Sequence, residues 1–95
     1  MEGQASISTE ILGRYAADAA REIVGVRDLP GRRAVKVRED EDAVRVELHV
    51  AVDWGASIPA IGLSVQERVR EYLLAMADVE AAAVEVVVDE IGPRA

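Results

Sequence analysis

The stretch AVRVELHVAVDWGASIPAIGLSVQERVREY, residues 43–72, predicts a strand, a sharp corner and a helix. Side chains alternate across a strand, so aliphatic residues at every second position share one face. The aliphatic positions of this strand are Val44, Val46, Leu48, Val50 and Val52. A slip of one residue would expose all of them, so the register is strongly specified. The corner follows, because Gly55 can turn freely and Ser57 can cap a helix that has Pro59 in its first turn.

The flanking sequence supplies the remaining elements of a small domain. A helix capped by Ser8 is expected to run to about residue 24, where Gly25 can end it. A first strand is expected at 34–38, an acidic loop at 39–42 and a last strand at 83–89, while the second helix fades near residues 77–78. The predicted fold class is α+β, an α-β-β-α-β two-layer sandwich with a three-stranded sheet and two helices on one face. We expect one domain over residues 1–95.

The order of the strands is less constrained than their number. The first two strands are expected to form an antiparallel hairpin, and the last strand returns after one helix, parallel to the central strand. We favour a position for it beside the first strand, which gives the order 2-1-3. A position beside the central strand is the alternative.

Composition excludes several classes of function. The chain has 95 residues, no Cys and a formal net charge of −7. The lack of Cys removes disulfides, thiolate metal sites and Cys nucleophiles. The negative charge opposes non-specific binding to nucleic acid or anionic lipid. No signal peptide is recognisable, and no apolar run approaches the roughly 20 residues that span a bilayer. We therefore expect a cytoplasmic protein that does not bind membranes directly.

The search for catalytic chemistry returns no site. His49 is the single histidine and falls on the polar face of the central strand, beside Arg45 and Glu47. A catalytic histidine needs a nucleophile and an orienting acid around it, so a solvated histidine is the favoured interpretation. The acidic run 39–42 lacks the spaced ligands and Gly of an EF-hand loop. We predict no enzyme activity, no cofactor and no metal.

Candidate contacts with other proteins come from the polar face and the corner. Trp54 either covers the edge of the core or faces a partner, because Trp is enriched at interface hot spots. The open face also carries small apolar positions, and its sheet has two open edges that can pair with another strand. The candidate partner-binding residues are Arg45, Glu47, His49, Trp54 and Val87. A homo-oligomer is expected.

One basic cluster suggests an alternative function. It consists of Arg32, Arg33, Lys36 and Arg38, near the first strand. The α-β-β-α-β order invites comparison with KH-like nucleic-acid-binding modules, which clamp the backbone with a GxxG loop. This sequence has no GxxG, and its net charge opposes polyanion binding. A KH-like module therefore remains the alternative, and no nucleic acid is expected as a partner.

The ordered motifs together resemble a known family, the alkaline-shock, Gls-type envelope stress response proteins of Gram-positive bacteria. The matching residues are the helix end AAREIVGV at 19–26, VKV at 35–37, the alternating strand 44–52, Trp54-Gly55, Ile58-Pro59, VQERV at 65–69 and VEV at 84–86. No single motif is specific, but their joint order and spacing cover nearly the whole chain.

The resemblance implies a non-enzymatic structural or adaptor protein that works through protein–protein contacts. It also implies a cytoplasmic location, and some family members are held at the inner face of the cell membrane by a separate anchoring protein with a related domain. Some family members self-associate. The long charged tails of many members are missing here, so functions assigned to tails do not transfer.

Overall fold

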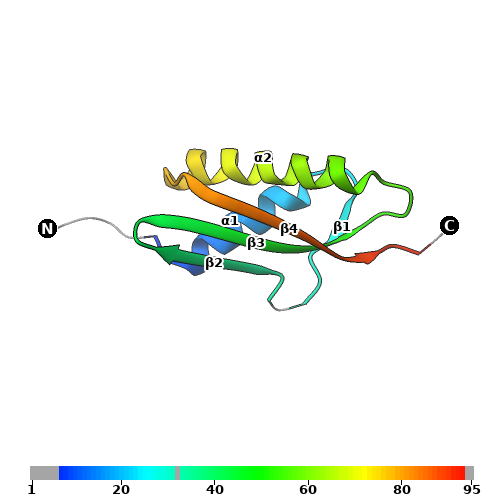
Figure 1. Cartoon of the computed structure of the whole chain (residues 1–95), viewed down its shortest axis with the longest axis horizontal. Helices are drawn as coiled ribbons and strands as arrows, with labels where there is room; N and C mark the ends of the chain where they lie inside the picture. Colours follow the sequence, from blue (N-terminus) through cyan, green and yellow to red (C-terminus); the bar gives the residue numbers. More distant parts are fainter. Residues whose placement is uncertain (1–6, 32, 94–95) are drawn as a thin grey trace, which may run out of the picture.

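The fold is shown by a computed structural model that describes residues 7–31 and 33–93. The elements follow the chain as α1 (Thr9–Arg21), β1 (Val26–Asp28), β2 (Val35–Asp40), β3 (Ala43–Val52), α2 (Ile58–Ala77) and β4 (Ala81–Ile91). Figure 1 shows the strands as one layer, with α1 behind the sheet and α2 along its β4 side. The α+β class and the two predicted helices are therefore confirmed.

Strand β3 is the centre of the sheet because every other strand pairs with it. Strand β2 pairs with it antiparallel, from Val35 opposite Leu48 to Asp40 opposite Ala43. Strand β4 pairs with it in parallel along nearly its whole length. The favoured order 2-1-3 is wrong, and the alternative beside the central strand is correct. A short α2 crossover returns the chain next to the strand that it left, which is the usual outcome for such connections.

The sheet also has a fourth strand where the sequence predicts only a connector. Strand β1 pairs antiparallel with the end of β3, with Val26 opposite Val52. Strand β1 can pair there because β3 has 10 residues and β2 has only 6, so β2 does not cover the whole length of β3. The unpaired end of β3 is thus available, and the Asp53 N–H donates to the Gly25 carbonyl at 2.9 Å beside it. The expected three-stranded sheet is therefore corrected to four strands.

The helix caps match the sequence, although α1 ends early. The Ser8 hydroxyl accepts a hydrogen bond from the Ile11 N–H at 3.2 Å, and the Ser57 hydroxyl accepts from the Ala60 N–H at 3.4 Å. Helix α1 stops at Arg21 rather than near residue 24, and Val24 is 95% exposed. Gly25 then turns the chain at φ 101°.

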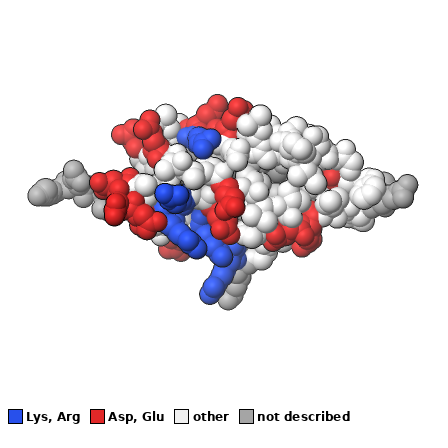
Figure 2. All heavy atoms as spheres, in the orientation of Figure 1, with Lys and Arg blue, Asp and Glu red and all other residues white. Residues whose placement is uncertain are grey.

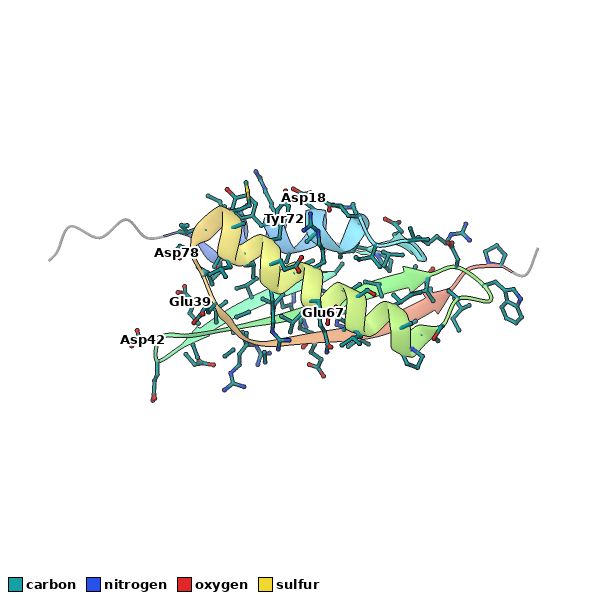
Figure 3. All side chains as sticks on the ribbon, turned by 90° about the horizontal axis from the view of Figure 1, so that it is seen from above. Asp18, Glu39, Asp42, Glu67, Tyr72 and Asp78 are labelled. Atoms are coloured by element: carbon teal, nitrogen blue, oxygen red, sulfur yellow. The ribbon has the colours of Figure 1, made fainter. Side chains whose placement is uncertain are left out.

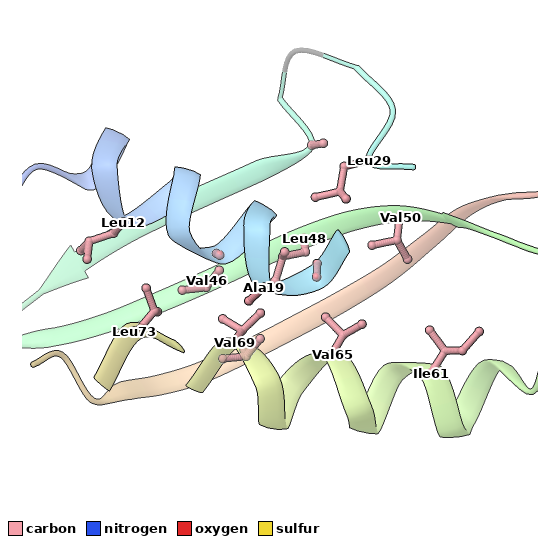
Figure 4. Packing of buried hydrophobic residues seen from close by; sticks show 14 of the residues in the cluster. Leu12, Ala19, Leu29, Val46, Leu48, Val50, Ile61, Val65, Val69 and Leu73 are labelled. Carbon is pink, nitrogen blue, oxygen red and sulfur yellow. The ribbon is translucent and has the colours of Figure 1, made fainter. Parts of the chain in front are cut away.

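The core lies between β3 and the two helices. All five alternating aliphatics of β3 are buried, as predicted. Figure 4 shows Val46, Leu48 and Val50 facing Leu12 and Ala19 of α1 together with a row from α2. That row consists of Ile61, Val65, Val69 and Leu73, which are all buried. Both helices therefore cover the same face of the sheet, which leaves the other face open.

A polar cluster fastens the two helices together outside this core. The Arg68 guanidinium of α2 donates to Glu22, just beyond α1, at 2.7 and 2.9 Å. It also lies 5.6 Å from the centre of the Tyr72 ring, and Tyr72 packs edge-on against Tyr15 at 6.0 Å. Hydrogen bonds to Glu22, first of all, raise the pKa of Arg68. The cluster explains the Arg of the VQERV motif as a structural contact between helices.

Candidate partner-binding surface

The open face of the sheet is built from rows of paired side chains. The strand register places Lys36 of β2, Glu47 of β3 and Glu85 of β4 in one row. The adjacent rows hold Arg38, Arg45 and Ala83 on one side, and His49 and Val87 on the other. Four of the five predicted partner-binding residues, Arg45, Glu47, His49 and Val87, therefore share this face. The alternation that buries one side of β3 forces them onto the other.

His49 is held between two carboxylates on this face. Its Nε2 lies 2.6 Å from Glu47 Oε2, and its Nδ1 lies 3.0 Å from Asp89 Oδ2. A neutral imidazole has one N–H and can donate to only one of them, whereas the imidazolium donates to both. The hydrogen bond to Glu47, and then the one to Asp89, raise the pKa of His49. The arrangement therefore favours the charged ring.

Glu47 is the centre of this network. The hydrogen bond from His49 lowers the pKa of Glu47, and Lys36, whose Nζ lies 3.9 Å from Glu47 Oε2, lowers it further. His49 lies on the open sheet face, where the sequence places it, but its side chain is 24% exposed and both ring nitrogens contact carboxylates. Asp89 was the missed residue, because 40 positions separate it from His49 and only the parallel pairing of β4 brings them together.

A cationic hollow lies next to this network. It is lined by Lys36, Arg38, Arg45, Val46, Glu47, Ala83 and Glu85. Figure 2 shows the Lys and Arg side chains gathered over β2 and the adjoining part of β3. Arg38 and Arg45 are directly opposite each other, an arrangement that destabilises a strand pair. Within residues 7–31 and 33–93 neither arginine forms a salt bridge, although the charge of Arg38 helps to lower the pKa of Glu47.

The proposed nucleic-acid cluster is only partly assembled. Lys36 and Arg38 share the open face, and Arg33 is exposed just before β2. Arg32 lies outside the described residues. The neighbouring Arg45 belongs to the same hollow, which the sequence cluster did not include.

Trp54 lies apart from the open-face network, in the corner between β3 and α2. Its side chain is 56% exposed, and it lines a shallow hollow with Ile58 and Ile91. The interpretation that Trp54 covers the edge of the core is therefore wrong. Trp54 belongs neither to the buried cluster nor to the residues packed against it, because it follows the end of β3 at Val52. Exposed apolar surface of this kind is typical of contact sites.

Residues 7–31 and 33–93 contain no group of three His, Asp or Glu side chains placed to hold a metal ion. Among the same residues, neither helix combines the length and apolarity needed to cross a bilayer.

The chain belongs to the alkaline shock protein 23 family, whose profile matches residues 1–93 and whose description gives a cell-envelope-related function. One relative is the protein named YqhY of Bacillus subtilis (strain 168), which is 30% identical. That match covers 78% of this chain and 66% of YqhY, so the chain spans just under two thirds of the relative. The resemblance predicted from the ordered motifs is thus confirmed.

Solved structures share the fold at low sequence identity. A MamM CTD variant in a copper form is 15% identical, with a TM-score of 0.63, and covers 90% of this chain and 100% of that chain. A cadmium form of another variant is 16% identical, with a TM-score of 0.61, and covers 87% of this chain and 98% of that chain. These similarities show the fold alone.

Proposed function

We propose that this protein is a non-enzymatic structural or adaptor protein of the cell-envelope stress response that acts through protein–protein contacts. The observation that carries the proposal is the open sheet face, where Glu47, His49 and Asp89 form an ordered network beside Val87. Small-molecule sites are usually deep and mostly apolar clefts, whereas this face is broad and polar. Membership of a family with a cell-envelope-related function supports the same conclusion.

The proposed binding residues divide into a polar part and an apolar part. Arg45, Glu47, His49 and Val87 supply fixed charges and a small apolar contact on the open face. Trp54 supplies an exposed aromatic side chain at one end of the domain. Interfaces commonly combine an aromatic anchor with a polar rim, and charges set the orientation of the partner. The whole chain would act as one such domain over residues 1–95.

Localisation at the membrane would come from a separate anchoring protein, with a related domain, at the inner face of the cell membrane. The apolar stripe of α1, formed by Leu12, Ala16, Ala19 and Ala20, is buried against the sheet. Inserting this stripe into lipid would expose the core, which would cost much of a typical domain stability of about 5–15 kcal/mol. A net charge of −7 also disfavours contact with anionic headgroups. Self-association would add avidity to such contacts.

Affinity capture from an envelope fraction tests the proposal. The protein should retain a membrane protein as a specific partner, and Trp54→Ala and His49→Ala should each reduce its recovery. Leu63→Ala is the matched control, because Leu63 is 57% exposed on α2 and lies away from both parts of the surface. Equal recovery of the partner with the unaltered protein and with all three variants would contradict the assignment of the surface. Recovery of no protein would contradict the function.

The cationic hollow is the feature that supports the alternative function, a KH-like nucleic-acid-binding module. Lys36, Arg38 and Arg45 could contact phosphates, but a net charge of −7 opposes a polyanion. We expect weak or no binding of single-stranded RNA in fluorescence anisotropy at physiological salt. Sub-micromolar binding that weakens steeply with salt would favour the alternative.

A further inference from the structure

One edge of the sheet is formed by β4 and the other by β1 and β2, and the two edges differ in their contacts. At the β4 edge, the Gln66 side-chain amide of α2 donates to the Val84 carbonyl at 3.0 Å. Helix α2 runs along this side of the sheet in Figure 1 and packs on β4. Covering an edge with a helix is a standard way to block strand addition. The β2 edge is therefore the one to consider.

The backbone of β2 presents pairing groups to solvent. The His49 N–H donates to the Ala34 carbonyl at 2.7 Å, so Ala34 directs its backbone groups at β3. Backbone groups alternate in direction along an antiparallel strand. Lys36 and Arg38 therefore also pair with β3, whereas the N–H and C=O groups of Val35 and Val37 are directed away from the sheet.

A groove runs beside this edge, between α1 and the start of β2. Its volume is about 410 Å³, and the small residues in its lining are Gly13 and Ala17 of α1 and Ala34, just before β2. The charged residues in the lining are two acids and two bases of α1: Glu10, Asp18, Arg14 and Arg21. Glycine is disfavoured inside a helix. A Cβ at Gly13 would lie 3.7 and 3.8 Å from the Val35 and Val37 side chains, which are ordinary contacts. The packing of the domain therefore does not require this glycine, and its small size widens the groove instead.

The charges beside the edge determine what can occupy it. The β2 side chains on the open face are Lys36, Arg38 and Asp40, and Arg45 of β3 lies opposite Arg38. Asp40 is at the hairpin end of β2, so the rest of this edge is cationic on its open face. A second copy paired through β2 about Val37 would place Lys36 opposite Arg38, so self-pairing is disfavoured. A strand with acidic residues on its open face would instead attract Lys36, Arg38 and Arg45. Its other face would place small apolar residues next to Gly13 and Ala17.

We propose that the β2 edge and the α1 groove bind an extended segment of a partner protein in which acidic and apolar residues alternate. The segment adds a strand to the sheet, its backbone pairs with Val35 and Val37, and its acids face Lys36 and Arg38. Strand addition beside a helix is an established mode of peptide recognition. This inference rests on the proposed function, because it names the chemistry of a protein partner.

Charge reversal tests the specificity of this site. The probes are two end-blocked, fluorescein-labelled peptides, one with four Glu-Val repeats and one with four Lys-Val repeats. The protein should bind the Glu-Val peptide at least about tenfold more tightly, and the double variant Lys36→Glu/Arg38→Glu should reverse this preference. Arg70→Glu, an exposed change on α2, is the matched control and should keep the original preference. The inference is overturned if the Glu-Val peptide does not bind or if the preference is not reversed.

A second probe separates strand addition from simple charge attraction. N-methylation of alternate Val residues removes the backbone donors of the peptide but keeps its charges, so its binding should fall at least about tenfold. Equal binding of the methylated peptide would overturn strand addition. Displacement of the Glu-Val peptide by an equal concentration of single-stranded RNA would assign the site to nucleic acid instead. Failure of peptide binding with intact capture of an envelope protein would overturn this inference alone.

Discussion

The two faces of β3 use the same alternation but different physical forces. On the helix face, Val46, Leu48 and Val50 are at most 2% exposed and pack against both helices. On the open face, Glu47 and His49 remain partly exposed and are held by ion pairs. Burial of aliphatic surface is strong and non-directional, whereas ion pairs at the surface contribute little to stability. The helix face therefore holds the fold together, and the open face can be altered without unfolding the domain.

The largest expected effect is a difference in the free energy of unfolding between variants of two neighbouring residues on opposite faces of β3. Leu48→Ala should lower the free energy of unfolding by about 2–5 kcal/mol, because it opens a cavity in the centre of the core. His49→Ala removes a side chain from the open face and should have a much smaller effect. Urea denaturation followed by circular dichroism measures both changes. Similar losses for the two variants would contradict the division between the faces.

The hairpin between β2 and β3 stores strain that a single change should relieve. Glu41 and Asp42 have φ angles of 45° and 71°, and Figure 3 shows Asp42 at the tip of the hairpin. Such two-residue turns favour glycine. Asp42→Gly should raise the free energy of unfolding by about 1 kcal/mol. Glu39→Gln removes a charge from the same acidic run without changing backbone freedom, and a gain equal to that of Asp42→Gly would assign the effect to charge alone.

The opposed arginines predict a smaller gain on the open face. Arg38→Glu should replace a repulsive cross-strand pair with an attractive one and stabilise the protein by about 0.2–1 kcal/mol. A double-mutant cycle measures the pair directly, because the gain should disappear when Arg45 is replaced by Ala. A gain that persists in the Arg45→Ala background would show that the two arginines do not interact.

The smallest expected effect depends on pH. The raised pKa of His49 adds stability that is present below its ordinary value of 6.5 and is lost as the pH rises through the higher folded value. The lowered pKa of Glu47 adds stability that is present above its ordinary value of 4.5 and is lost as the pH falls through the lower folded value. The stability difference between the protein and His49→Gln should therefore peak between pH 4.5 and 6.5. Thermal unfolding across pH 3–9 measures it, and a difference that does not vary with pH would exclude the charged network.

The sequence predicts the helix face better than the open face. Periodicity locates the five buried Val and Leu side chains of β3, and the capping roles of Ser8 and Ser57 follow from their side chains. The order of residues along the chain does not show which strands pair, so the contact between Asp89 and His49 was missed and the favoured position of the last strand was wrong. Strand β1 was missed because three residues carry almost no periodic signal. The exposure of Trp54 depends on where the corner projects, which only the packed fold determines.

The central claim is that contact with another protein, rather than with lipid, would place this protein at the envelope. Sedimentation of the pure protein with phosphatidylglycerol-containing vesicles at physiological salt tests it most directly. We expect the protein to stay in the supernatant with bare vesicles and to pellet once a membrane partner recovered by capture is reconstituted into them. Sedimentation with bare vesicles would contradict the claim.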